Sequence, residues 1–157
     1  MVAELELPEV SRPGRQTIRR TGRDMTQTKP QRSLYILFID DEPQIREFMT
    51  VCLAQFEHRV MAASGGKQGL EMFRTAMLKH QPYEVVITDL GMPEVDGRVV
   101  ARAIRAESPD TPIIMMTGWG VMMKEDGETV PDVDVVVNKP PRMQELNNLL
   151  LRMAKPA

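Results

Sequence analysis

The chain has one cysteine, few aromatic residues and no long apolar run. Cys52 has no second cysteine to pair with, and the absence of CxxC or Cys/His clusters excludes a disulfide framework and a structural zinc site. This usage is typical of a reducing cytoplasm, and we interpret Cys52 as a core residue. No apolar stretch approaches the roughly 20 residues of a membrane span, and the N-terminus lacks a long apolar region after its charges. We therefore expect no membrane insertion or export, and a cytoplasmic location.

Charge is unevenly distributed along the 157 residues. Residues 1–33 hold seven Lys or Arg and four Asp or Glu, and the remainder holds 13 and 18. The first 33 residues also contain three prolines and no sustained apolar period, which predicts a disordered basic arm. Arginines without interleaved aromatic residues favour a solvated tail over a nucleic-acid contact, and the acidic remainder also argues against nucleic acid. We expect a single folded domain over residues 34–155.

From residue 34 the chain alternates short apolar runs with longer amphipathic segments, which is the pattern of a parallel α/β sheet. The apolar runs are continuous rather than alternating, which indicates burial on both faces of the sheet. The predicted strands are Leu34–Ile39, Arg59–Ala63, Tyr83–Thr88, Pro112–Thr117 and Val133–Val137.

Helical spacing of apolar residues predicts the connecting helices. The expected inward residues are Ile45, Phe48, Met49, Cys52, Leu53 and Phe56 in the first helix, Leu70, Phe73 and Met77 in a second over Lys67–Lys79, Val99, Val100, Ala103 and Ile104 in a third over Arg98–Ala106, and Met143, Leu146, Leu150 and Met153 in the last. The helix expected after Thr117 is weak or short, because three glycines interrupt it. His58 and His80 fall near element ends and are expected to be exposed.

Polar residues follow four of the five predicted strands. Asp40 and Asp41 end the first, Asp89 the third, Thr117 the fourth and Lys139 the fifth. In open α/β sheets the carboxyl ends of the strands share one edge, where ligands bind. Three carboxylates packed there require a compensating cation, and Mg²⁺ prefers carboxylate and carbonyl oxygens together with phosphate oxygens.

This set predicts phosphoryl chemistry. An aspartate can act as a nucleophile and form an acyl phosphate, and an ammonium and a hydroxyl can stabilise the phosphoryl oxygens. Taken one at a time, the same residues could be helix caps, turn residues or solvated ends. Their joint order at the strand ends favours one shared site.

The motifs F-I-D-D-E at 38–42, I-T-D-L-G-M-P-E-V-D-G at 87–97, M-T-G at 116–118 and N-K-P at 138–140 make the chain resemble a receiver domain of two-component response regulators. The resemblance implies a flavodoxin-like, doubly wound, five-stranded parallel sheet of order 2-1-3-4-5 with flanking helices.

The resemblance also implies the role of each site residue. Asp89 would be the phosphoacceptor, with Thr117 and Lys139 binding the phosphoryl oxygens. The expected ligands of Mg²⁺, or of Mn²⁺ as the alternative, are Asp41, Asp40 through water, Asp89 and the backbone carbonyl of Gly91. The Lys139–Pro140 bond would be cis.

One departure from the family pattern concerns signalling. Val136 stands where many receivers have Tyr or Phe three residues before the site lysine, so an aromatic switch is lost. We expect the signal to pass through the segment after Thr117.

The leading hypothesis is a stand-alone receiver that accepts a phosphoryl group from a histidine kinase or a histidine phosphotransfer protein. It would signal by binding an unknown downstream protein or by passing the phosphoryl group on, and a homodimer stays open. Two alternatives are a receiver detached from a hybrid histidine kinase and a small magnesium-dependent phosphohydrolase with Asp89 as nucleophile. The nucleophile of aspartate-dependent phosphatases follows the first strand, which argues against the hydrolase.

Overall fold

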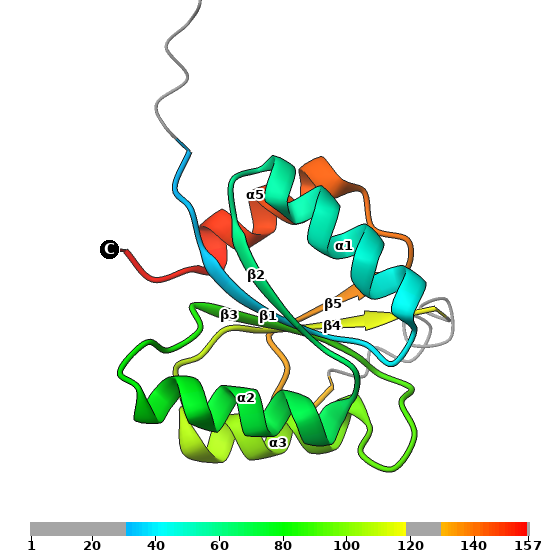
Figure 1. Ribbon diagram of the computed structural model, residues 1–157, viewed down its shortest axis with the longest axis vertical. Helices are drawn as coiled ribbons and strands as arrows, with labels where there is room; N and C mark the ends of the chain where they lie inside the picture. Colours follow the sequence, from blue (N-terminus) through cyan, green and yellow to red (C-terminus); the bar gives the residue numbers. More distant parts are fainter. Residues whose placement is uncertain (1–30, 119–129, 157) are drawn as a thin grey trace, which may run out of the picture. The chain divides into compact units, whose positions relative to one another are not determined.

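Five parallel strands form one sheet in the computed structural model, which describes residues 31–118 and 130–156 (Figure 1). Their order is β2-β1-β3-β4-β5. The predicted flavodoxin-like sheet and its strand order are confirmed, with element ends within two residues of the predictions. The strands are β1 (Tyr35–Ile39), β2 (Arg59–Ala63), β3 (Val85–Asp89), β4 (Ile113–Thr117) and β5 (Val135–Asn138).

Helices cover both faces of the sheet. α1 and α5 lie on one face and α2 and α3 on the other (Figure 1). The ranges are α1 (Pro43–Gln55), α2 (Gly66–Leu78), α3 (Gly97–Glu107) and α5 (Met143–Met153). Pro43 begins α1 at a position where its missing N–H costs nothing, and the Asp96 carboxylate caps α3 by accepting from two backbone N–H groups. The weak fourth helix expected after Thr117 falls mainly on residues 119–129, which lie outside the described residues.

The inner strand β1 supplies apolar side chains to two cores. Because successive side chains of a strand point to opposite faces, Ile36 and Phe38 pack with α1 and α5. Leu37 and Ile39 pack with α2 and α3 on the other face. All four side chains are fully buried. This explains why β1 reads as a continuous apolar run instead of an alternating one.

The two edge strands differ from the prediction of burial on both faces. Every residue of β3 and β4 is buried, whereas β5 alternates between partly buried and exposed, and three of the five residues of β2 are exposed. β2 and β5 end the sheet, so each has a strand neighbour on one side only among the described residues. An apolar run in this sequence therefore indicates a strand, but it does not indicate how deeply the side chains of that strand are buried.

Some residues expected to face inward lie at the margin of their helix. Phe48, Met77 and Val99 are 49%, 38% and 50% exposed, and Cys52 is only partly buried. The remaining residues of each stripe are buried or partly buried. The apolar stripe of α1, of α2 and of α3 is therefore wider than the contact of that helix with the sheet.

His58 is buried, and its prediction as an exposed loop residue is wrong. Its Nδ1 accepts a hydrogen bond from the Leu34 N–H at 3.0 Å, and its Nε2 lies 2.7 Å from Oδ1 of Asn147. The acceptor role of Nδ1 assigns the proton to Nε2, which then donates to the Asn147 oxygen. A neutral histidine thus joins the beginning of β1 to the middle of α5, and no pattern along the chain links these three positions.

The compact unit begins at Gln31, and the domain boundary at residue 34 stays a prediction. The Arg32 guanidinium pairs with the Glu84 carboxylate at 2.6 Å and donates to the carbonyl of Lys155. Glu84 also accepts the Tyr35 N–H at 2.8 Å. These bonds hold Arg32 beside the beginnings of β1 and β3. Disorder was predicted for residues 1–33, and of these residues 1–30 lie outside the described residues.

Replacing Asn147 with Ala should destabilise the fold. The substitution leaves the buried His58 Nε2–H without its acceptor, and a buried polar group that loses its partner costs about 1–3 kcal/mol. Chemical denaturation of the full chain would measure the free energy of unfolding. The matched control is Asn148→Ala on the exposed side of the same turn, where the expected change is below about 0.5 kcal/mol. Equal losses for the two variants would contradict the assigned role of His58.

Candidate functional site

Three carboxylates meet at the carboxyl ends of β1 and β3. Asp40 and Asp41 directly follow β1, and Asp89 is the last residue of β3, the strand paired with β1. Each side chain offers an oxygen, and these oxygens lie within 4.8 Å of one another. The predicted convergence of these three residues is therefore present in the structure.

Asp40 is fully buried, and both of its carboxylate oxygens are in use. Oδ1 accepts the Glu42 N–H at 2.9 Å, and Oδ2 accepts from Nζ of Lys139 at 2.7 Å. Asp41 is only partly buried and forms no ion pair with any residue in the described ranges. Its carboxylate is therefore the one better placed to take a ligand from solution.

Lys139 bridges the two buried carboxylates. Its Nζ lies 2.7 Å from Asp40 Oδ2 and 2.9 Å from Asp89 Oδ1. The Lys139–Pro140 peptide bond is cis, as the resemblance implies. The backbone N–H of Lys139 donates to the carbonyl of Thr117 at 2.9 Å, so the lysine is fixed to the end of β4 as well.

The charges shift the pKa values of two of these groups. Burial raises the pKa of Asp89, and the nearby Asp40 charge raises it further, while the bond to Lys139 opposes both. Burial lowers the pKa of Lys139, but its bonds to Asp40 and Asp89 outweigh burial, so its pKa is raised. The Lys139 ammonium is shared by two carboxylates, so its pKa is raised by two partners, whereas the pKa of Asp89 is lowered by only one ammonium. The pocket thus holds a permanent cation beside a carboxylate that is costly to ionise.

Thr117 carries an unsatisfied hydroxyl. Its residue is 3% exposed, and Oγ1 makes no hydrogen bond within residues 31–118 and 130–156. Buried polar atoms normally have a partner, so such an orphan needs an explanation. Thr117 follows Met116, which pairs in register with Asp89 on the neighbouring strand. The free hydroxyl therefore belongs to the strand end beside the acidic cluster.

Comparison with protein families gives the decisive match: residues 36–151 match the response regulator receiver domain. The chain belongs to this family. A receiver domain is a signalling module rather than a classical enzyme, so the family does not support the phosphohydrolase alternative.

Curated relatives divide into long and short proteins. A probable transcriptional regulator ycf27 of Guillardia theta is 39% identical over 85 residues, which are 54% of this chain and 31% of that protein. The chain thus spans about a third of the length of such relatives. The response regulator receiver protein CpdR of Brucella abortus is 27% identical over 118 residues, covering 75% of this chain and 94% of that protein.

Solved structures agree with the receiver fold. The response regulator TrrA of Thermotoga maritima, in complex with Mg²⁺-BeF, has a TM-score of 0.67 and 28% identity, covering 76% of this chain and 98% of that one. The chemotaxis protein CheY4 of Vibrio cholerae has a TM-score of 0.65 and 26% identity, covering 78% and 99%.

The acidic cluster of this receiver fits Mg²⁺. Three carboxylates supply hard oxygen donors within one small volume, and Asp41 is open to solution. Asp41 and Asp89 would hold the ion, with Asp40 acting through a water because its own oxygens are bound within the protein. The Gly91 carbonyl remains a predicted ligand. When bound, Mg²⁺ would neutralise negative charge on the three carboxylates and on a phosphoryl group.

Sequence reasoning missed Arg46. Its guanidinium donates to the backbone carbonyl of Asp40 at 2.8 Å and so holds the start of the acidic pair from the first turns of α1. Only its spacing of six residues from Asp40 could have indicated this, and an arginine at that position of a helix is more often solvated.

No helix among the described residues is both long and apolar enough to cross a membrane.

Replacing Asp89 with Asn should stabilise the metal-free receiver at neutral pH. Because the folded-state pKa of Asp89 is raised, ionising it disfavours the folded state, and stability falls as the pH rises through that pKa. The gain of Asp89→Asn should therefore be present at pH 7 and shrink toward zero as the pH falls toward the ordinary carboxyl value. Urea denaturation in EDTA would measure it. Asp110→Asn, at an exposed carboxylate, should change little at either pH. A loss of stability in Asp89→Asn at pH 7 would contradict the pKa direction.

Proposed function

We propose that this receiver accepts a phosphoryl group from a phosphohistidine onto Asp89 in the presence of Mg²⁺. The observation that supports this best is the placement of the Asp89 carboxylate 2.9 Å from the largely buried Lys139 side chain, which is 14% exposed, and within the three-carboxylate cluster. One oxygen of Asp89 is engaged by Lys139, and the other is the candidate nucleophile.

The chain's own residues would divide the work of phosphoryl transfer. An Asp89 oxygen attacks phosphorus, the bond from phosphorus to the donor imidazole nitrogen breaks, and the nitrogen keeps the bonding electrons. The Lys139 ammonium, already placed beside the acceptor, binds one phosphoryl oxygen. The free Thr117 hydroxyl donates to another, which gives its orphaned Oγ1 a partner.

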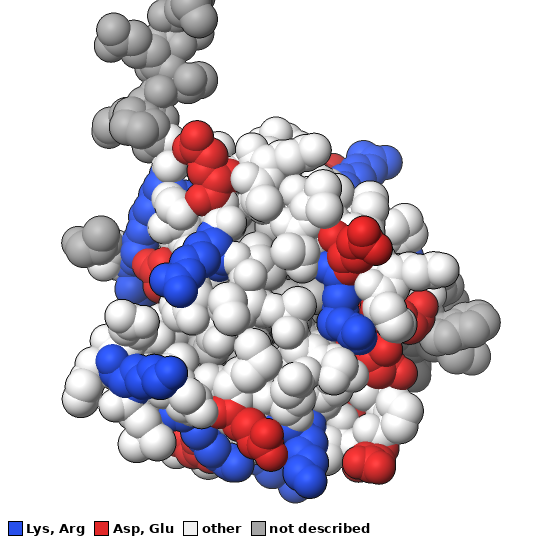
Figure 2. Space-filling model, in the orientation of Figure 1, with Lys and Arg blue, Asp and Glu red and all other residues white. Residues whose placement is uncertain are grey.

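The donor would be a histidine kinase or a histidine phosphotransfer protein, since the family works with such proteins. The output partner is a protein in this proposal. On the face in Figure 2, Lys and Arg side chains are interspersed with Asp and Glu, so that face has no single-sign footprint for nucleic acid. Cytoplasmic location, a homodimer and the status of an independent or hybrid-derived receiver stay predictions.

The route of the signal away from the site would not use an aromatic side chain of β5. Val136 is a partly exposed aliphatic residue in β5, and it has no ring to rotate inward. We therefore expect residues 117–131 to respond to phosphorylation, with Thr117 as the first residue to move. The described residues include only the two ends of this segment.

Incubating the full chain with Mg²⁺ and acetyl phosphate should add one phosphoryl group, detected by intact mass. Asp89→Asn should remove the addition, because no other carboxylate of the cluster contacts the ammonium while remaining free to attack. The control Asp96→Asn changes a carboxylate that caps α3 and should leave the addition unchanged. Phosphoryl addition that persists in Asp89→Asn would overturn the proposed acceptor.

Replacing Thr117 with Val tests the proposed role of the hydroxyl separately from folding. The hydroxyl makes no hydrogen bond in the described structure, so its removal should leave the free energy of unfolding unchanged or higher. Phosphorylation by acetyl phosphate should nevertheless slow by roughly 10²-fold, the usual effect of losing one donor to a developing negative charge. Unchanged kinetics would show that Thr117 does not contact the phosphoryl group.

A further inference from the structure

The loop that follows Asp89 is closed into a small ring. The Gly97 N–H donates to the Leu90 carbonyl at 2.9 Å, which joins the two ends of residues 90–97. Between them Met92 is 8% exposed and packs into the core under α2 and α3. Glu94 has a φ of 65°, an uncommon value for a residue with a side chain. A closed and anchored ring cannot absorb a displacement at one residue without moving the others.

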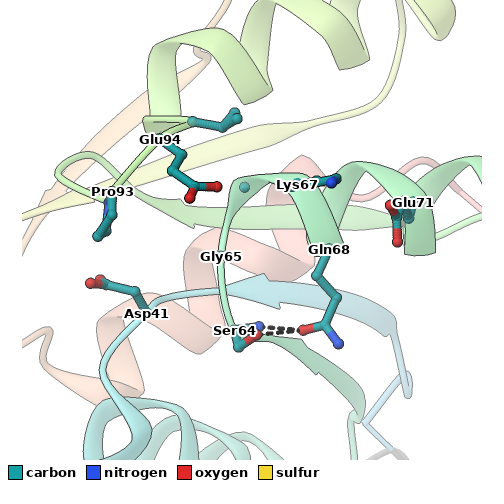
Figure 3. Close-up of a pocket in the computed structure, with 10 residues that line it drawn as sticks. Asp41, Ser64, Gly65, Lys67, Gln68, Glu71, Pro93 and Glu94 are labelled. Carbon is teal, nitrogen blue, oxygen red and sulfur yellow. Dashed lines mark hydrogen bonds between the residues drawn. The ribbon is translucent and has the colours of Figure 1, made fainter.

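This ring touches the start of α2. The segment Ser64–Gln68, which includes the first turn of α2, and the ring border a cavity of about 500 Å³ that also reaches Asp41 (Figure 3). At its edge a Cβ on Gly66 would lie 2.5 Å from the carbonyl oxygen of Val95 and 2.7 Å from its Cγ1. Real Cβ atoms do not approach so closely, so the contact requires glycine.

The Ser64–Gln68 segment is itself held in place. The Gln68 side-chain oxygen accepts from both the N–H of Ser64 at 2.6 Å and its hydroxyl at 2.9 Å (Figure 3). Val95 packs from the other side against the core. Two fixed backbones therefore meet at Gly66 and Val95, and neither can move away cheaply.

We propose that Gly66 is a positioning residue for the metal and phosphoryl site: its missing side chain lets α2 support the ring at Val95, which keeps Gly91 and Asp89 in register with Asp41. This inference rests on the proposed function. Adding a methyl group at residue 66 pushes Val95 outward, and the closed ring transmits the shift to Gly91. Gly66 has no side chain that could bind a metal, so its proposed effect is only on the positions of Gly91 and Asp89.

Two neighbouring glycines give matched controls. A Cβ on Gly65 meets nothing within 4 Å, and its φ of 173° is extended backbone that any residue adopts. A Cβ on Gly69 would overlap Cδ1 of Ile39, the mobile end of a core side chain, and would not touch the ring. Gly65→Ala thus tests added volume in the loop, and Gly69→Ala tests disturbed packing of α2.

The experiment is calorimetric titration of Mg²⁺ alone into the full chain, with the melting temperature measured in parallel without metal. Gly66→Ala should raise the Mg²⁺ dissociation constant by roughly tenfold, the usual effect of removing support from a metal ligand. Gly65→Ala should match the wild type, and Gly69→Ala should lower the melting temperature without changing the dissociation constant.

The outcomes separate this inference from the proposed function. A wild type that does not bind Mg²⁺ would refute the proposed function and this inference with it. A wild type that binds Mg²⁺, with Gly66→Ala equal to Gly65→Ala, would refute only the role of Gly66. A Gly69→Ala loss of affinity as large as that of Gly66→Ala would also refute it, because general packing would then explain both.

A second variant keeps the inference testable where Gly66→Ala does not fold. Val95→Ala removes the Cγ atoms that lie over Gly66 and should also weaken Mg²⁺ binding, because only the backbone and Cβ of residue 95 are then left to support the ring on α2. Its control is Val99→Ala, a substitution of the same size at a half-exposed position of α3. Equal Mg²⁺ affinity in these two variants would overturn the proposed support.

Discussion

A single ammonium group organises the acidic end of this receiver domain. Lys139 contacts two carboxylates that would otherwise repel each other, and one of them, Asp40, is inaccessible to solvent. Removing the lysine would leave the charge of two buried carboxylates uncompensated, which is far costlier than losing an exposed pair. The parallel direction of the strands matters because it brings Lys139, directly after β5, to the same edge as the ends of β1 and β3.

The two buried carboxylates differ in what they can still do. Asp40 has both oxygens bound within the protein, and Arg46 holds its backbone from α1. Asp89 has one oxygen bound to Lys139 and a pKa raised by burial. Asp40 is therefore fixed in place as a structural charge, and Asp89 keeps an oxygen for chemistry. Residue type alone does not distinguish them, since both are aspartates at strand ends.

The resemblance to receiver domains was sufficient for the strand order. The convergence of Asp40, Asp41, Asp89 and Lys139 followed from the sequence pattern, because parallel strands in an α/β sheet end at one edge. The sequence pattern was insufficient where contacts join distant segments. His58 looked like a surface residue because its partners lie 24 and 89 positions away. The Gly66–Val95 contact was equally invisible, since a glycine before a helix is ordinary and only its neighbour across the loop explains it. The prediction that Phe48 and Val99 face inward was wrong for a simpler reason. Helical spacing indicates which side of a helix faces the sheet, but not how wide the contact between helix and sheet is.

The depth of the Lys139 cluster also determines how the pocket responds to its surroundings. Exposed pairs of the same fold, such as Arg142 with Glu145, lie in water and weaken as dissolved ions accumulate. The lysine side chain is 14% exposed and Asp40 is sealed from solvent, so dissolved salt screens this pair less than it screens an exposed one. Added salt therefore weakens the attraction of this surface for charged molecules more than it weakens the field of Lys139 at Asp89.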